Sequence, residues 1–336
     1  MPVKDERLAR KIARVRDGEL EEARRRFGDS LTGAAFSEDG IRSIAEDINE
    51  AALKALWAQP AYGAVARRLA ELGVPRAADK GVVAHALRDG FRMGTATVAL
   101  YLHATPGGLT YSRLLAVGAL TGNPGHGKTH ALIAYMRFLG YIEPGGVGDD
   151  GRERPYRPTE RMREAFRSYF LEHLQAITPL SPEAGAVKQL IEAEDGLFDR
   201  FMAHVGEGMM LIGMVGRQQE DQGPTMGLFS DRRSGMAMLW RILLSAPDDG
   251  RWPAAESFPL SIADLARRCG VSRSHVQRLL KDAEAAGMLT TDGLGGVRVT
   301  PLLHQEVHSF LGIFVICLAG CARDLLKGRT ARGHGG

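Results

Sequence analysis

The stretch Gly122-Asn-Pro-Gly-His-Gly-Lys-Thr129 fits the phosphate-binding pattern G-x-x-x-x-G-K-[ST] at every defined position. In that chemistry backbone amides hold the phosphates, Lys128 contacts the β and γ oxygens, and Thr129 binds Mg²⁺. Such a loop follows a buried strand, whereas the preceding segment 111–120 has the apolar spacing of a helix. A Gly-rich turn that opens a helix is therefore the preferred interpretation, and a P-loop nucleotide-binding protein stays an alternative.

Two pairs of potential metal ligands occur near the C-terminus. His304 and His308 are four residues apart, as are Cys317 and Cys321, so each pair shares a helix face. The pair centres are about 13 residues apart, or close to 20 Å along a helix, too far for one zinc site. The sequence also contains no H-E-x-x-H and no G-x-S-x-G motif. We expect no metal, no cofactor and no enzymatic activity.

The strongest pattern is a helix-turn-helix at residues 260–283. Ile262, Leu265, Ala266 and Cys269 share one face of a first helix. Gly270 suits a turn with positive φ, Val271 is expected in the core, and Ser272 is a natural N-cap. The inward face of the second helix is predicted to contain Val276, Leu279, Leu280 and Ala283.

The outward face of this second helix is rich in cations and hydrogen-bond donors, which suits the DNA major groove. Two short alternating segments, 288–291 and 297–300, follow it and predict a β-hairpin wing. The residues expected to contact DNA are Ser272, Arg273, Ser274, His275, Gln277, Arg278 and Lys281 on the helix and Arg298 on the wing.

An internal repeat extends the same logic to the first half of the chain. Arg92-Met-Gly94-Thr-Ala96 is matched by Arg233-Ser-Gly235-Met-Ala237, 141 positions later. Leu139-Gly140-Tyr141-Ile142 is matched by Ala286-Gly287-Met288-Leu289, 147 positions later. These ordered matches indicate a duplicated unit. The DNA contacts predicted in the first copy are His126, Lys128, Thr129 and His130 on the helix and Arg152 and Arg154 on a longer wing.

Each repeat resembles the MarR group of winged-helix transcriptional regulators. Their wing carries an Asp-x-Arg element, and Asp150-Gly151-Arg152 occupies the corresponding place. The resemblance implies double-stranded DNA binding, dimerisation through flanking helices and a wing arginine in the minor groove. This chain departs from the family because both heads lie on one chain and because its second wing lacks Asp-x-Arg.

Composition sets limits on the remaining function classes. The 336 residues suggest about two domains, and 44% hydrophobic with 25% charged residues is typical of a globular chain. The net charge is only +3, so a nucleic-acid surface must arise from local clustering. Three cysteines favour a reducing, cytoplasmic location. The longest apolar run, 310–322, is shorter than the roughly 20 residues that span a bilayer, so no membrane is expected.

The predicted fold is mostly α with small β-hairpin wings: tandem winged helix-turn-helix domains joined and flanked by helices, a pseudo-dimer. The predicted order is a helical region (1–90), a first winged helix (91–160), a connector (161–232), a second winged helix (233–302), a packing helix (303–328) and a flexible tail (329–336). The methionines of segment 202–214 are expected in the core, with a small-molecule effector cavity as the alternative.

The predicted function is transcriptional regulation through sequence-specific binding of double-stranded DNA. One chain would read an asymmetric or pseudo-palindromic operator with two winged helices, as a monomeric pseudo-dimer or as a homodimer. The alternatives are a plasmid-type replication initiator with tandem winged helices and, with less support, the P-loop protein.

Overall fold

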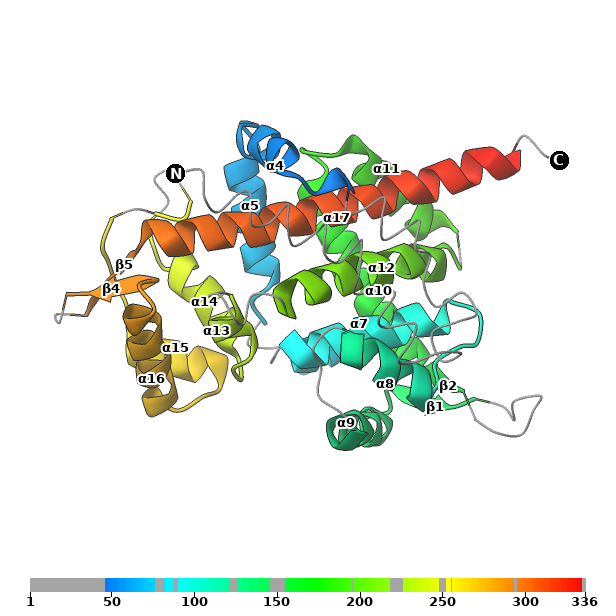
Figure 1. Cartoon of the computed structure of the whole chain (residues 1–336), viewed down its shortest axis with the longest axis horizontal. Coiled ribbons are helices and arrows are strands. Elements are labelled where there is room, and N and C mark those ends of the chain that lie inside the picture. Colours follow the sequence, from blue (N-terminus) through cyan, green and yellow to red (C-terminus); the bar gives the residue numbers. More distant parts are fainter. Residues whose placement is uncertain are drawn as a thin grey trace. The chain divides into compact units, whose positions relative to one another are not determined.

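A computed structural model describes residues 46–75, 81–86, 90–120, 126–145, 155–194, 196–217, 226–247, 252–254, 256–292 and 295–333. The chain is mostly helical, with two small antiparallel sheets in the described part (Figure 1). It divides into two compact units, and each unit draws on separate stretches of sequence. Unit 1 comprises residues 1–52, 94–218 and 315–336, and unit 2 comprises 53–93 and 219–314.

Unit 1 is built from helices around one short hairpin. Its hairpin pairs β1 (Ile142–Pro144) with β2 (Tyr156–Pro158), and Leu109 adds an isolated bridge to Tyr156. Phe166, Phe170 and Phe201 are among its buried core residues. The helices are α7 (Gly90–His103, shared with unit 2), α8 (Tyr111–Leu120), α9 (His126–Phe138), α10 (Glu160–Ile177), α11 (Pro182–Ala193) and α12 (Leu197–Arg217).

Unit 2 contains the second sheet, in which the strand order is β3-β5-β4. The strands are β3 (Phe258–Pro259), β4 (Leu289–Thr291) and β5 (Gly296–Val299). The sequence predicted only the β4–β5 hairpin, because a two-residue strand has no alternating pattern to detect. Its helices are α4 (Glu50–Trp57, shared with unit 1), α5 (Tyr62–Leu72), α6 (Val82–Ala86), α13 (Gly227–Ser230), α14 (Gly235–Leu244), α15 (Ile262–Cys269) and α16 (Arg273–Ala285).

Close packing explains two glycines. A Cβ on Gly206 of α12 would lie 2.1 Å from the ring of Tyr101 in α7, so only glycine fits at this crossing in unit 1. In unit 2, a Cβ on Gly73 would lie 2.7 Å from Trp240 of α14. In both cases the missing side chain lets a large aromatic ring pack directly against a helical backbone.

The last helix, α17 (Pro301–Gly333), is longer than predicted. It contributes residues to both compact units, and it is still helical at 329–333, where a flexible tail was expected. Within its segment Pro301–Gly328, the most apolar stretch of 18 residues has a mean hydropathy of 1.8. By length and composition, this segment could therefore cross a membrane. The prediction of a run too short to span is therefore wrong for the helix as a whole. Because 56% of that window is buried within the protein, α17 also fits the description of a core helix.

Candidate nucleic-acid interface

The α15–turn–α16 segment has the local geometry predicted for a helix-turn-helix. The Ser261 side chain accepts a hydrogen bond from the backbone N of Asp264 (3.2 Å) and so caps α15. Gly270 ends α15 in the left-handed conformation (φ 63°, ψ 40°). Ser272 then accepts from the backbone N of His275 (3.2 Å) and caps α16. Capping and the glycine turn are local effects, which is why the sequence predicts them correctly.

Helix α16 divides cleanly into a buried and an exposed side. Val276, Leu279 and Ala283 are fully buried, and Leu280 is nearly so. Val271 in the turn is only half-buried, so its predicted place in the core is wrong. The side exposed to solvent contains Arg273, Ser274, Gln277, Arg278 and Lys281.

The cations of this exposed side differ from those around it in having no carboxylate partner. Arg268 of α15 pairs with Asp264 (2.6 Å), as does Arg267. Arg232 pairs with Asp282 (2.6 Å), which fixes the second half of α16. Among the described residues, no ion pair involves the side chains of Arg273, Arg278 or Lys281. Their charge is available to an external anion.

His275 is held by the protein itself. Its Nε2 lies 3.2 Å from the backbone oxygen of Arg233, and the side chain is half-buried. One ring nitrogen of His275 therefore has a partner within the protein, and the contact of His275 with a base stays a prediction. Its sequence neighbours could not reveal the contact with Arg233, which joins positions 42 residues apart.

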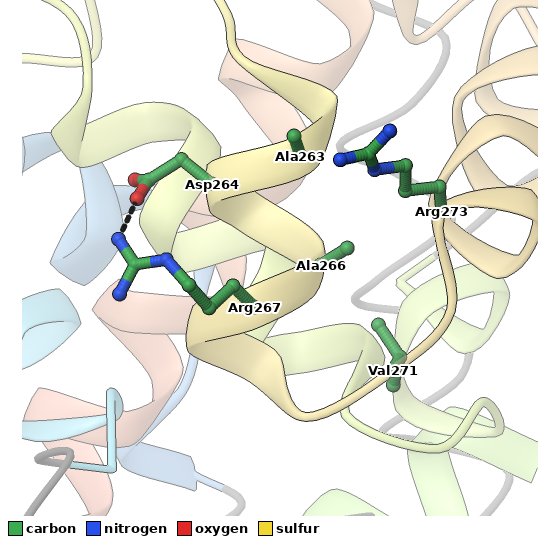
Figure 2. A pocket seen from close by; sticks show the side chains of 6 residues that line it. All are labelled: Ala263, Asp264, Ala266, Arg267, Val271 and Arg273. Atoms are coloured by element: carbon green, nitrogen blue, oxygen red, sulfur yellow. Dashed lines mark hydrogen bonds and ion pairs between the residues drawn. The ribbon is translucent and has the colours of Figure 1, made fainter.

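A shallow pocket of about 500 Å³ lies between α15 and the start of α16. Figure 2 shows the Arg273 side chain extending toward Ala263, while Arg267 turns to Asp264 on the other side of α15. Arg273 is thus the cation of this pocket that has no carboxylate partner among the residues drawn.

The wing next to α16 is a β-hairpin braced by two carboxylates. Glu284 accepts hydrogen bonds from the backbone N (3.0 Å) and the hydroxyl (2.9 Å) of Thr291. Asp292 accepts from the backbone N of Gly296 (2.8 Å). Arg298 is exposed on β5, between the buried Val297 and Val299. The predicted wing cation therefore points to solvent.

Thr300 forms hydrogen bonds that connect this wing to the start of α17. Its hydroxyl donates to the backbone oxygen of Gly287 (2.7 Å), and its backbone N donates to that of Met288 (3.1 Å). The same hydroxyl accepts from the backbone N of Leu303 (3.4 Å). Gly287 has φ 71°.

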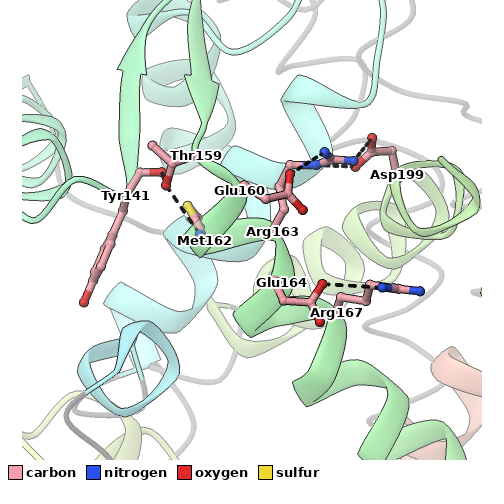
Figure 3. Close-up of polar contacts among 8 residues, drawn as sticks. All are labelled: Tyr141, Thr159, Glu160, Met162, Arg163, Glu164, Arg167 and Asp199. Atoms are coloured by element: carbon pink, nitrogen blue, oxygen red, sulfur yellow. Dashed lines mark hydrogen bonds and ion pairs between the residues drawn. The ribbon is translucent and has the colours of Figure 1, made fainter. Parts of the chain in front are cut away.

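In unit 1, Thr159 has the corresponding role between β2 and α10. Its hydroxyl donates to the backbone oxygen of Gly140 (2.9 Å), and its backbone N donates to that of Tyr141 (2.8 Å). Figure 3 shows the third bond, from the backbone N of Met162 to the Thr159 hydroxyl (3.4 Å). The same figure shows Arg163 binding Asp199 (2.7 Å), which ties α10 to α12.

Helix α9 exposes three of its predicted DNA contacts. His126, Lys128 and His130 are exposed, whereas Thr129 is 5% exposed and packs inward. Thr129 is therefore removed from the predicted set, and its inward position agrees with the helical period. The hydroxyl of Tyr111 in α8 lies 3.1 Å from Nδ1 of His126, and the Tyr111 ring also contacts the His130 ring, with centroids 6.3 Å apart. Arg152, Arg154 and the Asp150–Arg152 element lie outside the described residues.

The segment before the P-loop pattern is not the buried strand that a P-loop requires. Residues 122–125 lie outside the described part, but 111–120 is helix α8 rather than a strand, and Lys128 lies in the first turn of α9. Thr129, which would bind Mg²⁺ in a P-loop, is also buried. Within the described ranges, no cluster of three or more His, Cys, Asp or Glu could hold a metal.

The remaining candidate residues belong to the packing of their units. Burial raises the pKa of Cys317 to about 12, with a further contribution from Asp47, and Cys321 is buried beside it on α17. Met202 is fully buried in α12, as expected for a core residue, whereas Met209 is only half-buried. The side chains of residues 210–217, including Met210 and Met214, lie outside the described part.

Comparison with known families finds one match. The IclR helix-turn-helix domain model matches residues 254–293, which cover β3, α15, α16 and β4. No curated protein and no solved structure matches the chain. The match supports a winged helix-turn-helix regulator, but the matched domain at 254–293 is of the IclR type and not of the MarR type expected from the sequence. The C-terminal part of the chain therefore contains a helix-turn-helix domain of a DNA-binding, regulatory class, the IclR type.

Proposed function

We propose that this protein is a cytoplasmic transcriptional regulator that binds a specific double-stranded DNA site without catalysing a reaction. The observation that carries the proposal is the exposed side of α16. There, Arg273, Arg278 and Lys281 form no ion pair with a carboxylate of the described residues. Gln277 is exposed on the same side of the helix. Arginine and glutamine side chains can form paired hydrogen bonds with guanine and adenine edges in the major groove. Arg298 on the wing would lie at the adjacent minor groove, where narrow A·T-rich stretches attract arginine.

We further propose that α8, α9 and the β1–β2 hairpin form a second DNA-binding head, related to the first by duplication. Support comes from hydrogen bonds at matched positions. Thr159 and Thr300 are 141 positions apart, and both bond the glycine that ends the recognition helix and the residue after it. Both glycines have positive φ, 66° for Gly140 and 71° for Gly287. The bridge from Leu109 to Tyr156 corresponds to the pairing of β3 with β5.

The test begins with selection of bound sequences from random duplexes by the full-length protein. Contact with about 6–10 phosphates predicts that log K falls with log[salt] at a slope of about −5 to −9. Lys281→Ala should reduce that slope by about 1. Lys188→Ala is the matched control, because Lys188 is engaged by Glu192 (2.9 Å) on α11, and it should leave the slope unchanged.

Enrichment of no sequence, or a slope near zero, would exclude DNA as the main partner. Repeated copies of the site at a replication origin, together with unwinding of adjacent DNA, would instead indicate the replication initiator.

A further inference from the structure

Helix α9 presents an outward face whose chemistry differs from that of α16. Gly127, Ala131, Ala134 and Phe138 have the spacing of one helix face, and all four are exposed. Phe138 is 83% exposed, which singles it out among the large hydrophobic side chains of the described residues. In Figure 1, α9 lies at the edge of its own unit. We name these four residues the apolar stripe of α9.

Alignment of the two recognition helices shows what the apolar stripe replaces. With Gly140 matched to Gly287, the stripe falls opposite Ser274, Arg278, Lys281 and Ala285 of α16. The arginine and lysine of α16 thus become alanines on α9. An alanine or phenylalanine side chain cannot form a hydrogen bond with a base edge, but it can contact the 5-methyl group of thymine in the major groove.

Charge favours DNA over a second copy of this chain as the occupant of the stripe. Lys128 and Arg137 are exposed beside it, and no ion pair involves either of them within the described ranges. A polyanion would neutralise both cations. A twofold pairing of the stripe with itself would bring the same cations of two copies together, which is unfavourable.

We infer that α9 recognises thymine methyl groups through Ala131 and Ala134, with Phe138 extending the apolar contact and Lys128 and Arg137 binding flanking phosphates. The inference rests on the proposed function, because it states which base, thymine, is recognised by the proposed DNA-binding head that contains α9. One half of the site is then rich in thymine, whereas the half read by α16 is recognised through hydrogen bonds.

The experiment replaces thymine by uracil, which removes only the 5-methyl group, in one half of the selected site at a time. Uracil in the α9 half should weaken binding by about fourfold per contacted thymine, the ratio that corresponds to ~0.8 kcal/mol per buried methyl-sized group. Uracil in the α16 half should change the affinity less than about twofold. Ala131→Gly/Ala134→Gly should bind thymine and uracil sites equally, and Ala285→Gly on α16 is the control for adding a glycine to an exposed helix.

Three outcomes would overturn the inference, and they are distinguishable. In the first outcome, the unaltered protein binds thymine and uracil sites equally but still distinguishes base sequences in the half-site read by α16. This result would exclude recognition of thymine methyl groups and leave the proposed function in place. If Phe138→Ser lowers the molecular mass in solution and does not affect uracil discrimination, the stripe binds a second copy. If the unaltered protein binds no duplex selectively, the proposed function fails and the inference fails with it.

Discussion

Arg278 and Lys281 lie one turn apart on the exposed side of α16, yet they are expected to contribute differently. An arginine that pairs with guanine loses its partner when the base changes, whereas a lysine on a phosphate is indifferent to sequence. Arg278→Ala should weaken binding by about 1–3 kcal/mol and relax the preference at one base pair. Lys281→Ala should weaken all sites by a similar factor. Affinities measured on a set of single-base variants distinguish the two patterns, and uniform loss with Arg278→Ala would reassign that residue to a phosphate.

Two glycines of α12 provide a matched test of packing at the residue scale. A Cβ at Gly206 would meet the Tyr101 ring at 2.1 Å, while one at Gly208 would meet Cys317 at an ordinary 3.5 Å. Gly206→Ala should lower the free energy of unfolding by about 1–3 kcal/mol, because a buried ring cannot retreat. Gly208→Ala should be neutral or stabilising by up to ~1 kcal/mol through helix propensity. Denaturant unfolding of both variants measures the difference, and equal effects would contradict the close crossing of α7 and α12.

At the scale of elements, Thr159 and Thr300 each join a hairpin to the helix that follows it. Thr159→Val and Thr300→Val keep the size of the side chain but remove a hydroxyl that donates to a backbone oxygen and caps a helix. Each should lower stability by about 0.5–2 kcal/mol, and serine at either position should restore most of the loss. Thermal and denaturant unfolding provide the measurement. A large effect at one position and none at the other would argue against the equivalence of the two heads.

The contact between α5 and α17 should make stability depend on pH. Burial, with a smaller contribution from His304, lowers the pKa of His308 from 6.5 to about 4. Nδ1 of His308 lies 3.2 Å from the Tyr62 hydroxyl. Between pH 6.5 and 4 the unfolded chain binds a proton at His308 that the folded protein does not, so stability should fall as pH falls through this window. His308→Gln should flatten that part of the profile, and an unchanged slope would show that His308 is not responsible.

Local sequence predicts some of these elements and misses others for physical reasons. The caps at Ser261 and Ser272 and the turn at Gly270 depend on neighbours within a few residues, so the sequence reveals α15 and α16. The contact of His275 with Arg233 and the strand β3 depend on pairings between distant segments. The exposure of Phe138 could not be predicted from the sequence either, because the apolar spacing of a helix does not show which of its faces packs against another element.

For the whole molecule, the two compact units do not follow the linear order of the sequence. Residues 53–93 belong with the helix-turn-helix of unit 2, while 94–218 form most of unit 1, and α17 contributes to both. Sequence periodicity cannot predict this interleaving, because it carries no information on which buried faces pair. One α8–α9 pair lies in unit 1 and one α15–α16 pair in unit 2, so each proposed head has its own supporting core.

Two unlike heads on one chain predict an asymmetric DNA site. A homodimer with identical heads selects a palindrome, but here Arg273 aligns with His126 and Arg278 with Ala131. The half-sites should therefore differ in sequence. Arg273→Ala/Arg278→Ala and Ala131→Gly/Ala134→Gly should each become indifferent to scrambling of one half-site, and of a different one. Binding assays on sites scrambled in either half test this, with the unaltered protein sensitive to both. A perfect palindrome, or equal loss of sensitivity to both halves in each variant, would replace the single-chain reader by a symmetric pair of chains that each use one head.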